Sequence, residues 1–154
     1  MVVRLVFIVL FAGLVSLPAV AGATCGKLCD KEFMKGATVA EIRATIAQGA
    51  DVNARNKNGK SPLHGAARDN ENPEVVKALI GAGADVNAQD NWRLSPLHGA
   101  AQDNENPAVM KALVAAGADV NARTKEGSSP LYGAARWNKN PAVAKTLIGA
   151  GADV

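Results

Sequence analysis

The sequence predicts an all-α protein, a solenoid of stacked antiparallel helix pairs with hairpin-like turns between them. The string SPLHGAA begins at Ser61 and Ser95 and returns as SPLYGAA at Ser129, each step being 34 residues, and GADV recurs at the same interval. A fixed period of this length is typical of stacked supersecondary units. The composition agrees with the pattern: six aromatic residues are too few for a β-sandwich core, whereas abundant alanine, valine and leucine suit closely packed short helices.

The first helix of each repeat is predicted from its cap and its spacing. Ser61 stands where a helix cap is expected, and Pro62 follows at the first helical position. Proline is tolerated there because the backbone N–H that it lacks would have no hydrogen-bond partner within the helix. Apolar residues then recur at helical spacing from Leu63 to Ala67. We expect this helix to end near Asn70, with the asparagine in a left-handed conformation.

The second helix begins at an Asn-Pro pair. Asn72 is placed to cap Pro73, and the stretch Val75 to Ile80 presents an apolar stripe. Gly83 is expected to end the helix, because glycine readily adopts a positive φ. The Asp-Val-Asn sequence at Asp85 and the polar residues after it predict an extended turn to the next repeat. One such unit cannot bury both helices, so neighbouring units must supply the core.

Three strings, S-P-L-H-G-A-A, V-V-K-A-L-I and G-A-D-V-N, resemble the ankyrin repeat over residues 50–154. The sequence departs from that family in three ways. Its period is 34 rather than about 33, and the extra residue falls in the N-E-N-P turn, where a longer loop is tolerated. Arg93 replaces the usual hairpin glycine, so that turn must change conformation or carry strain. Glycine at 65, 99 and 133 fills a position inside the first helix, at some cost in helix propensity.

The chain divides into five segments. We expect a signal peptide at 1–23, a degenerate N-terminal capping repeat at 24–54, and ankyrin repeats at 55–88, 89–122 and 123–154, the last without a C-terminal cap. In the capping repeat, Lys27 to Lys35 is expected to form the first helix, with Gly36 as its stop. Thr38 and Glu41 read as a capping box that begins the second helix. An end at Val154 leads us to expect a truncated reading frame or a partner that covers the last repeat.

The first 23 residues have the layout of a secretory signal peptide. Arg4 is the one side-chain charge, an apolar run follows, and small residues surround expected cleavage after Ala21 or Ala23. This predicts a periplasmic or secreted protein, in a bacterial envelope because the chain has no N-x-S/T sequon. The alternative is an uncleaved inner-membrane anchor, since Leu5 to Ala23 is long enough to cross a bilayer.

Two cysteines, Cys25 and Cys29, lie four residues apart near the predicted mature N-terminus. In an oxidising compartment this pair is expected to form a disulfide that pins the end of the chain. The spacing differs from the C-x-x-C of redox-active pairs, which favours a structural bridge. A redox or stress-linked accessory that cycles Cys25 and Cys29 is kept as an alternative function.

The sequence contains no pattern typical of an enzyme or a nucleic-acid-binding protein. A formal net charge of +3 is small for phosphate neutralisation, which argues against nucleic acid as a partner. No phosphate loop, zinc-ligand cluster or nucleophile elbow is present, so we expect neither catalysis nor a cofactor. His64 and His98 recur by period, and the ankyrin resemblance implies that they tie the helix start to the adjacent turn. The periodic aspartates, such as Asp85, are expected to stabilise turns.

The predicted function is non-catalytic binding of a protein partner of unknown identity. The ankyrin resemblance places the recognition surface on the concave face, formed by the hairpin turns and the exposed side of the first helices. By register, its candidate residues are Arg55, Lys57, Asn58, Lys60, Arg68, Asp69, Gln89, Asn91, Trp92, Leu94, Gln102, Asp103, Lys125, Glu126, Ser128, Arg136 and Trp137. Tryptophan and arginine dominate interface energetics. The alternatives are that the tryptophans pack over neighbouring turns and helices, and that the protein is a membrane-tethered scaffold if its signal segment is retained.

Overall fold

The computed structural model describes residues 25–154, so the predicted signal peptide lies outside the described residues. Those residues form one 3-10 helix and eight α-helices, and no strand is found among them. In chain order they are η1 (Gly26–Cys29), α1 (Lys31–Gly36), α2 (Val39–Ala47), α3 (Pro62–Asp69), α4 (Pro73–Gly81), α5 (Pro96–Asp103), α6 (Pro107–Ala115), α7 (Pro130–Trp137) and α8 (Pro141–Gly149). The predicted all-α class is confirmed.

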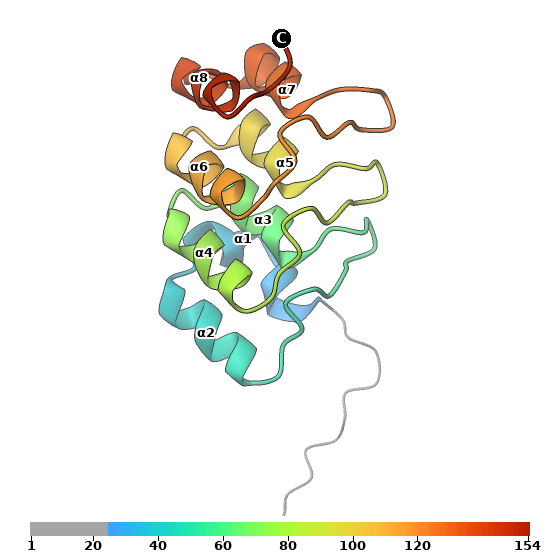
Figure 1. Ribbon diagram of the computed structural model, residues 1–154. Coiled ribbons are helices and arrows are strands. Elements are labelled where there is room, and N and C mark those ends of the chain that lie inside the picture. The colour runs from blue at the N-terminus through green and yellow to red at the C-terminus, as the bar shows by residue number, and fades with distance from the viewer. Residues whose placement is uncertain (1–24) are drawn as a thin grey trace, which may run out of the picture.

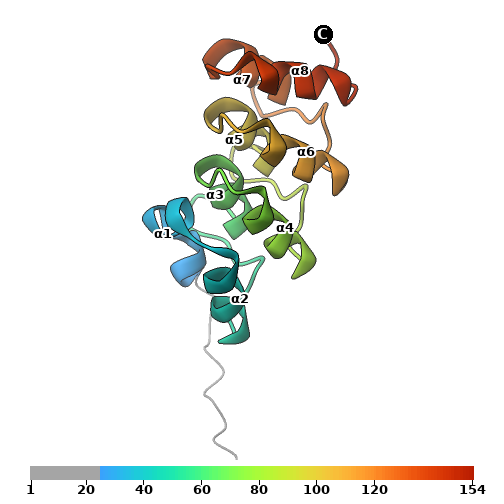
Figure 2. The same ribbon diagram turned by 90° about the vertical axis from the view of Figure 1, so that its left-hand side faces the viewer.

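The helices stack as four antiparallel pairs (Figure 1). The first helices α1, α3, α5 and α7 form one row, and the second helices α2, α4, α6 and α8 form the other, as the turned view shows (Figure 2). Long turns project from the side of the first helices, one above another (Figure 1). We call the surface between these hairpin turns and the first helices the inner face.

The core lies mainly between neighbouring pairs, as expected for units that cannot bury their own apolar faces. Leu63, Leu79, Leu97 and Leu113 are fully buried, and small alanines between them allow close approach of the helices. The core is continuous from Leu28 in the capping repeat to Ala152. Each repeat is therefore held in place by apolar packing against its neighbours.

The two histidines join successive repeats, as the ankyrin resemblance implied. Nδ1 of His64 accepts a hydrogen bond from the main-chain N–H of Ser61, 3.1 Å away, while Nε2 lies 2.9 Å from the main-chain oxygen of Leu94 in the next hairpin. His98 makes the same pair of contacts with Ser95 and Ser128. Each histidine thus fixes a hairpin turn against the helix below it.

The structure corrects the expected role of Asn70. Its φ is −107° and its ψ is 121°, an extended conformation rather than a left-handed one. Its side-chain amide donates to the main-chain oxygens of Met34 and Ala37 in the preceding repeat, at 2.8 and 3.0 Å. The asparagine ends the helix by adopting an extended conformation, and its side chain binds the preceding repeat.

The capping repeat also differs from its predicted form. One helix over Lys27–Lys35 is wrong: the segment breaks at Asp30, which has extended dihedral angles and accepts a hydrogen bond from the N–H of Phe33 at 2.7 Å. Gly36 is the last residue of α1 rather than its stop. The capping box of Thr38 and Glu41 is confirmed by reciprocal bonds of 3.3 and 2.9 Å.

Arg93 adopts a φ of 61°, and it is the one non-glycine residue with positive φ in the described part of the chain. The equivalent residues of the adjacent hairpins are Gly59, with φ of 76°, and Gly127, with φ of 79°. The turn therefore keeps its shape and places an arginine in the left-handed region, where an L side chain is strained. This confirms one of the two expected outcomes. No helix within residues 25–154 has the length and apolar character needed to cross a bilayer.

Candidate protein-binding groove

One polar side chain organises each hairpin turn. Oδ1 of Asn56 accepts the N–H groups of Asn58 and Lys60, at 2.9 and 3.0 Å. One repeat later, Oδ1 of Asp90 accepts the N–H groups of Trp92 and Leu94, both at 2.9 Å. In the third hairpin, Oγ1 of Thr124 accepts the N–H of Ser128 at 3.1 Å. This local bonding holds each turn open over the first helices and fixes the direction of the residues that follow.

The hairpins are also linked to one another. Arg55 donates from Nη1 to the main-chain oxygens of Gly59 and Gln89, both at 2.8 Å, and Asn91 N–H donates to Asn58 at 3.1 Å. Between the second and third hairpins, the N–H of Lys125 donates to the main-chain oxygen of Trp92 at 3.0 Å. These bonds set Trp92 beside the third hairpin. The turns therefore form a bonded series rather than three independent loops.

The mid-helix glycines at 99 and 133 lie where successive first helices pack closely against each other. A Cβ added at Gly99 would lie 3.4 Å from Cβ of Arg68, and one at Gly133 would lie 3.8 Å from Cβ of Gln102. A side chain from the preceding repeat thus packs over each glycine. Larger residues at these positions would press against the preceding first helix.

Two tryptophans flank a groove in the upper part of the inner face. Trp92 from the second hairpin and Trp137 from the end of α7 are each 50% exposed. They line a cavity of about 220 Å³ whose other walls include Leu94, Gln102 and Glu126. We call this cavity the tryptophan groove. Its two indole rings provide large apolar surfaces on side chains with few rotatable bonds, which suits a binding site.

Contacts from its own helix orient Trp137. Its ring meets Tyr132 edge-on, with 5.6 Å between centroids and an interplanar angle of 86°. The guanidinium of Arg136 lies 5.4 Å from the centroid of the same ring. Trp137 therefore packs against residues of its own helix, α7, rather than covering a neighbouring helix. Half of the surface of Trp137 stays exposed.

A second cavity of about 250 Å³ adjoins the tryptophan groove and shares Leu94 and Gln102 with it. We call it the acidic pocket, because four carboxylates line it against three cationic side chains: Asp30, Asp69, Asp90 and Asp103 against Lys31, Lys60 and Arg68. Arg68 and Asp69 neutralise each other, with Nη2 and Oδ2 2.8 Å apart. Three carboxylates and two lysines remain.

The predicted site residues all retain partial or full exposure, and two groups of them are brought together. The acidic pocket collects Lys60, Arg68, Asp69 and Asp103. The tryptophan groove collects Trp92, Lys125, Glu126, Ser128 and Trp137, and both cavities include Leu94 and Gln102. Six predicted residues line neither cavity: Arg55, Lys57, Asn58, Gln89, Asn91 and Arg136. Arg55 and Asn91 instead hold adjacent hairpins together.

Sequence reasoning missed the contribution of the capping repeat to this surface. Cys29, Asp30, Lys31 and Met34 line the acidic pocket, and so does Asp90. The capping repeat has no SPLH string, so its residues could not be placed by register. Asp90 had a usable signal, because it occupies the position of Asn56 and Thr124 and is the one carboxylate among the three.

Electrostatics at the histidines agree with a structural role. Desolvation by burial lowers the pKa of both His64 and His98 below the usual value of 6.5, so the neutral imidazole is favoured in the folded state. Within residues 25–154, no three His, Cys, Asp or Glu side chains lie close enough to hold a metal ion. The inner face presents aromatic rings, hydrogen-bonding groups and charged side chains to a binding partner.

Stacked helix pairs with hairpin turns, each held to the next by histidine and asparagine side chains, define a helical repeat protein of the solenoid class. A family model for ankyrin repeats (3 copies) matches residues 34–121 and again residues 63–154, and the chain therefore belongs to the ankyrin-repeat family. Ankyrin repeats are generally protein–protein interaction modules and are typically non-catalytic. A search of curated proteins found no match to the chain.

Proposed function

We propose that the protein is a non-catalytic scaffold that binds a partner protein in the tryptophan groove and the acidic pocket. The observation that carries the proposal is the pair Trp92 and Trp137, each half-exposed and placed on a common cavity. A partner side chain inserted there would exclude water from both rings, which is the usual setting of an interface hot spot. Because the array is already ordered, binding would cost little conformational entropy.

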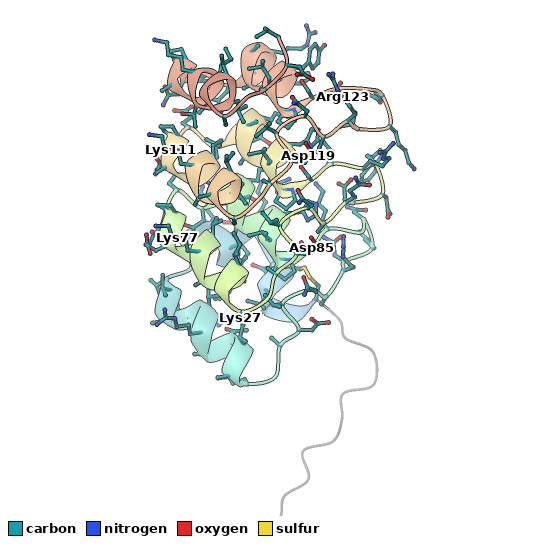
Figure 3. All side chains as sticks on the ribbon, viewed as in Figure 1. Lys27, Lys77, Asp85, Lys111, Asp119 and Arg123 are labelled. Atoms are coloured by element: carbon teal, nitrogen blue, oxygen red, sulfur yellow. A yellow bond between two sulfur atoms is a disulfide. The ribbon has the colours of Figure 1, made fainter. Side chains whose placement is uncertain are left out.

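The second helices provide a matched control surface. Lys77 and Lys111 lie one above the other on the row opposite the hairpins (Figure 3), and Lys145 follows them by register in α8. All three lysines are exposed. Their replacement by alanine changes as many side chains as a groove variant does, but on a surface that the proposal gives no role.

Affinity capture of extracytoplasmic proteins on the full chain tests the proposal. The groove variant carries Trp92→Ala, Arg136→Ala and Trp137→Ala, and the control variant carries Lys77→Ala, Lys111→Ala and Lys145→Ala. Circular dichroism must show that both remain folded. We expect a partner that is retained by the original protein and the control and is lost by the groove variant. Equal capture by all three proteins would contradict the proposed site, and capture by none would contradict the binding function.

We also propose that the protein is exported with cleavage after Ala21 or Ala23, as the N-terminal sequence pattern favours. The sulfur atoms of Cys25 and Cys29 lie within disulfide distance of each other, which supports this setting, because such bridges persist in oxidising compartments. Intact mass and N-terminal sequencing of the protein purified from the cell envelope test it. A mature chain that begins at Gly22 or Thr24 is expected. A chain that retains Arg4 and fractionates with the membrane would favour the tethered alternative instead.

A further inference from the structure

We infer that the partner inserts a cationic side chain, arginine or lysine, into the acidic pocket and places an apolar side chain between Trp92 and Trp137. This inference rests on the proposed function and specifies the chemistry of the bound segment. Three observations support it: the charge imbalance of the pocket, the state of Asp90, and the continuity of the pocket with the tryptophan groove.

Asp90 lies in the wall of the acidic pocket and is only 6% exposed. Its Oδ1 accepts two hydrogen bonds from the hairpin, but Oδ2 is buried and accepts none from any described residue. The two ion pairs among residues 25–154 are Arg68–Asp69 and Lys77–Glu74, so neither includes Asp90. A buried carboxylate without a charge partner is unfavourable, and a cation bound in the adjoining pocket would reduce that cost through its electric field, without contacting the buried Oδ2.

The hairpin does not require a carboxylate at this position. Asn56 makes the same two bonds one repeat earlier through a neutral amide, and Thr124 holds the third hairpin with a hydroxyl. The negative charge of Asp90 is therefore not needed to stabilise the turn. Since a buried charge is screened less than an exposed one, it acts on whatever occupies the adjoining pocket.

The competing occupant is an acidic segment, which the exposed Lys57, Arg93 and Lys125 of the hairpin tips would attract. Pairs formed by such exposed charges are hydrated and contribute little, typically up to about 1 kcal/mol. Lys57 and Arg93 line neither cavity, whereas Lys125 lines the tryptophan groove. The buried carboxylate therefore favours a cationic side chain at the centre of the site.

The residues common to the two cavities determine how far apart the cationic and apolar side chains of the partner must lie. Leu94 and Gln102 belong to both cavities, and Asp90 and Trp92 lie two residues apart in one hairpin. A bound strand can thus reach both cavities with side chains only a few residues apart. The recognition pattern expected is a lysine or arginine followed or preceded at short spacing by an aromatic or aliphatic residue.

A random peptide library displayed on phage tests this inference without a known partner. It is selected on the full chain, on Asp90→Asn, which removes a carboxylate from the acidic pocket, and on Asn56→Asp, which adds one, because Asn56 lines the same pocket. Asp90→Asn copies the native Asn56 and should keep the fold, and Asp90→Thr, which copies Thr124, is a second variant of the same kind. Circular dichroism and thermal unfolding verify folding of each protein.

We expect the original chain and Asn56→Asp to enrich basic-apolar peptides, and Asp90→Asn to lose the preference for the basic residue. A synthetic peptide from the selection should bind Asp90→Asn roughly tenfold more weakly, about the effect of one partly buried charge pair. Replacing its cationic residue by glutamine should weaken binding to the original chain by a similar factor and leave binding to Asp90→Asn unchanged.

Three results would overturn the inference. Selected peptides could lack a cationic residue, could be acidic, or could bind Asp90→Asn as well as the original chain; in each case peptide binding in the groove, and with it the proposed function, would stand. If no peptide is enriched, the inference fails, and the capture experiment with the groove variant then decides the fate of the proposed function by itself.

Discussion

The side-chain amide of Asn104 donates a hydrogen bond to the main-chain oxygen of Asn70, the equivalent residue one repeat earlier, at 2.9 Å. Asn138 bonds Asn104 in the same way at 2.9 Å. Each asparagine also reaches the end of the preceding first helix, as Asn104 does at Ala67. The asparagines thus form a ladder along the array, which makes the turn between the helices of each pair part of the contact between repeats.

Asn104→Ala should destabilise the array strongly. Asn104 is 2% exposed, and its loss would leave the buried oxygens of Ala67 and Asn70 and the N–H of Asn106 without their partner. Unsatisfied buried groups of this kind cost about 3 kcal/mol together. Urea unfolding followed by circular dichroism measures the effect. Asn138→Ala is the matched control: its side chain is half-buried, so the loss should be smaller. Equal losses would contradict the importance of burial.

Arg93→Gly should raise the free energy of unfolding by about 1 kcal/mol, because it relieves a left-handed arginine in a turn that glycine forms elsewhere in the chain. Gly127→Ala should cost a similar amount, since a Cβ there meets no atom within 4 Å and only the φ of 79° opposes it. Gly59→Ala should cost more, because its Cβ would lie 3.0 Å from the main-chain nitrogen of Asn91. Thermal unfolding of the three variants ranks them, and a destabilised Arg93→Gly would show that the arginine makes a compensating contact.

Stability should fall as the pH drops below about 6.5. Burial lowers the pKa of His64 and His98 in the folded state, so below the unfolded value the unfolded chain binds more protons. The contribution of the two neutral imidazoles to the free energy of unfolding is therefore fully present above pH 6.5. It is lost as the pH falls from that value to the lowered pKa that the histidines have in the folded state. Unfolding midpoints measured across this range should decline in the original protein and much less in His64→Gln/His98→Gln. Parallel curves would show that other groups cause the decline.

Reduction of the Cys25–Cys29 disulfide should loosen the capping repeat and leave the remaining repeats folded. The bridge closes a short loop, whose stabilisation is about 2 kcal/mol at most on chain-entropy grounds. Sγ of Cys25 lies 3.4 Å from the main-chain oxygen of Ala54, which places the bridge against the start of the first hairpin. Hydrogen exchange should therefore increase in residues 25–54 alone. Rapid cycling of the pair by mild reductants, without a change in exchange, would favour the redox alternative.

The periodic strings were enough to predict the helix pairs, their proline starts and their glycine ends, because these features depend on neighbours within one repeat. The role of Asn70 could not be predicted the same way, since its partners Met34 and Ala37 approach only when repeats stack. The break at Asp30 was missed because the capping repeat lacks the periodic string. Trp92 and Trp137 were among the binding residues predicted by register, but the groove between them and its continuity with a pocket around buried Asp90 form only when adjacent repeats stack.

Intrinsic fluorescence reports directly on partner binding in the tryptophan groove, because Trp92 and Trp137 are the two tryptophans of the chain and both line the groove. The probe is a groove-binding peptide or a captured partner that lacks tryptophan, added to saturation. We expect a shift of the emission to shorter wavelength and protection from acrylamide quenching, with the shift reduced in each single variant, Trp92→Ala and Trp137→Ala. Unchanged emission and unchanged quenching at saturation would contradict this expectation, because the partner would then bind elsewhere on the molecule.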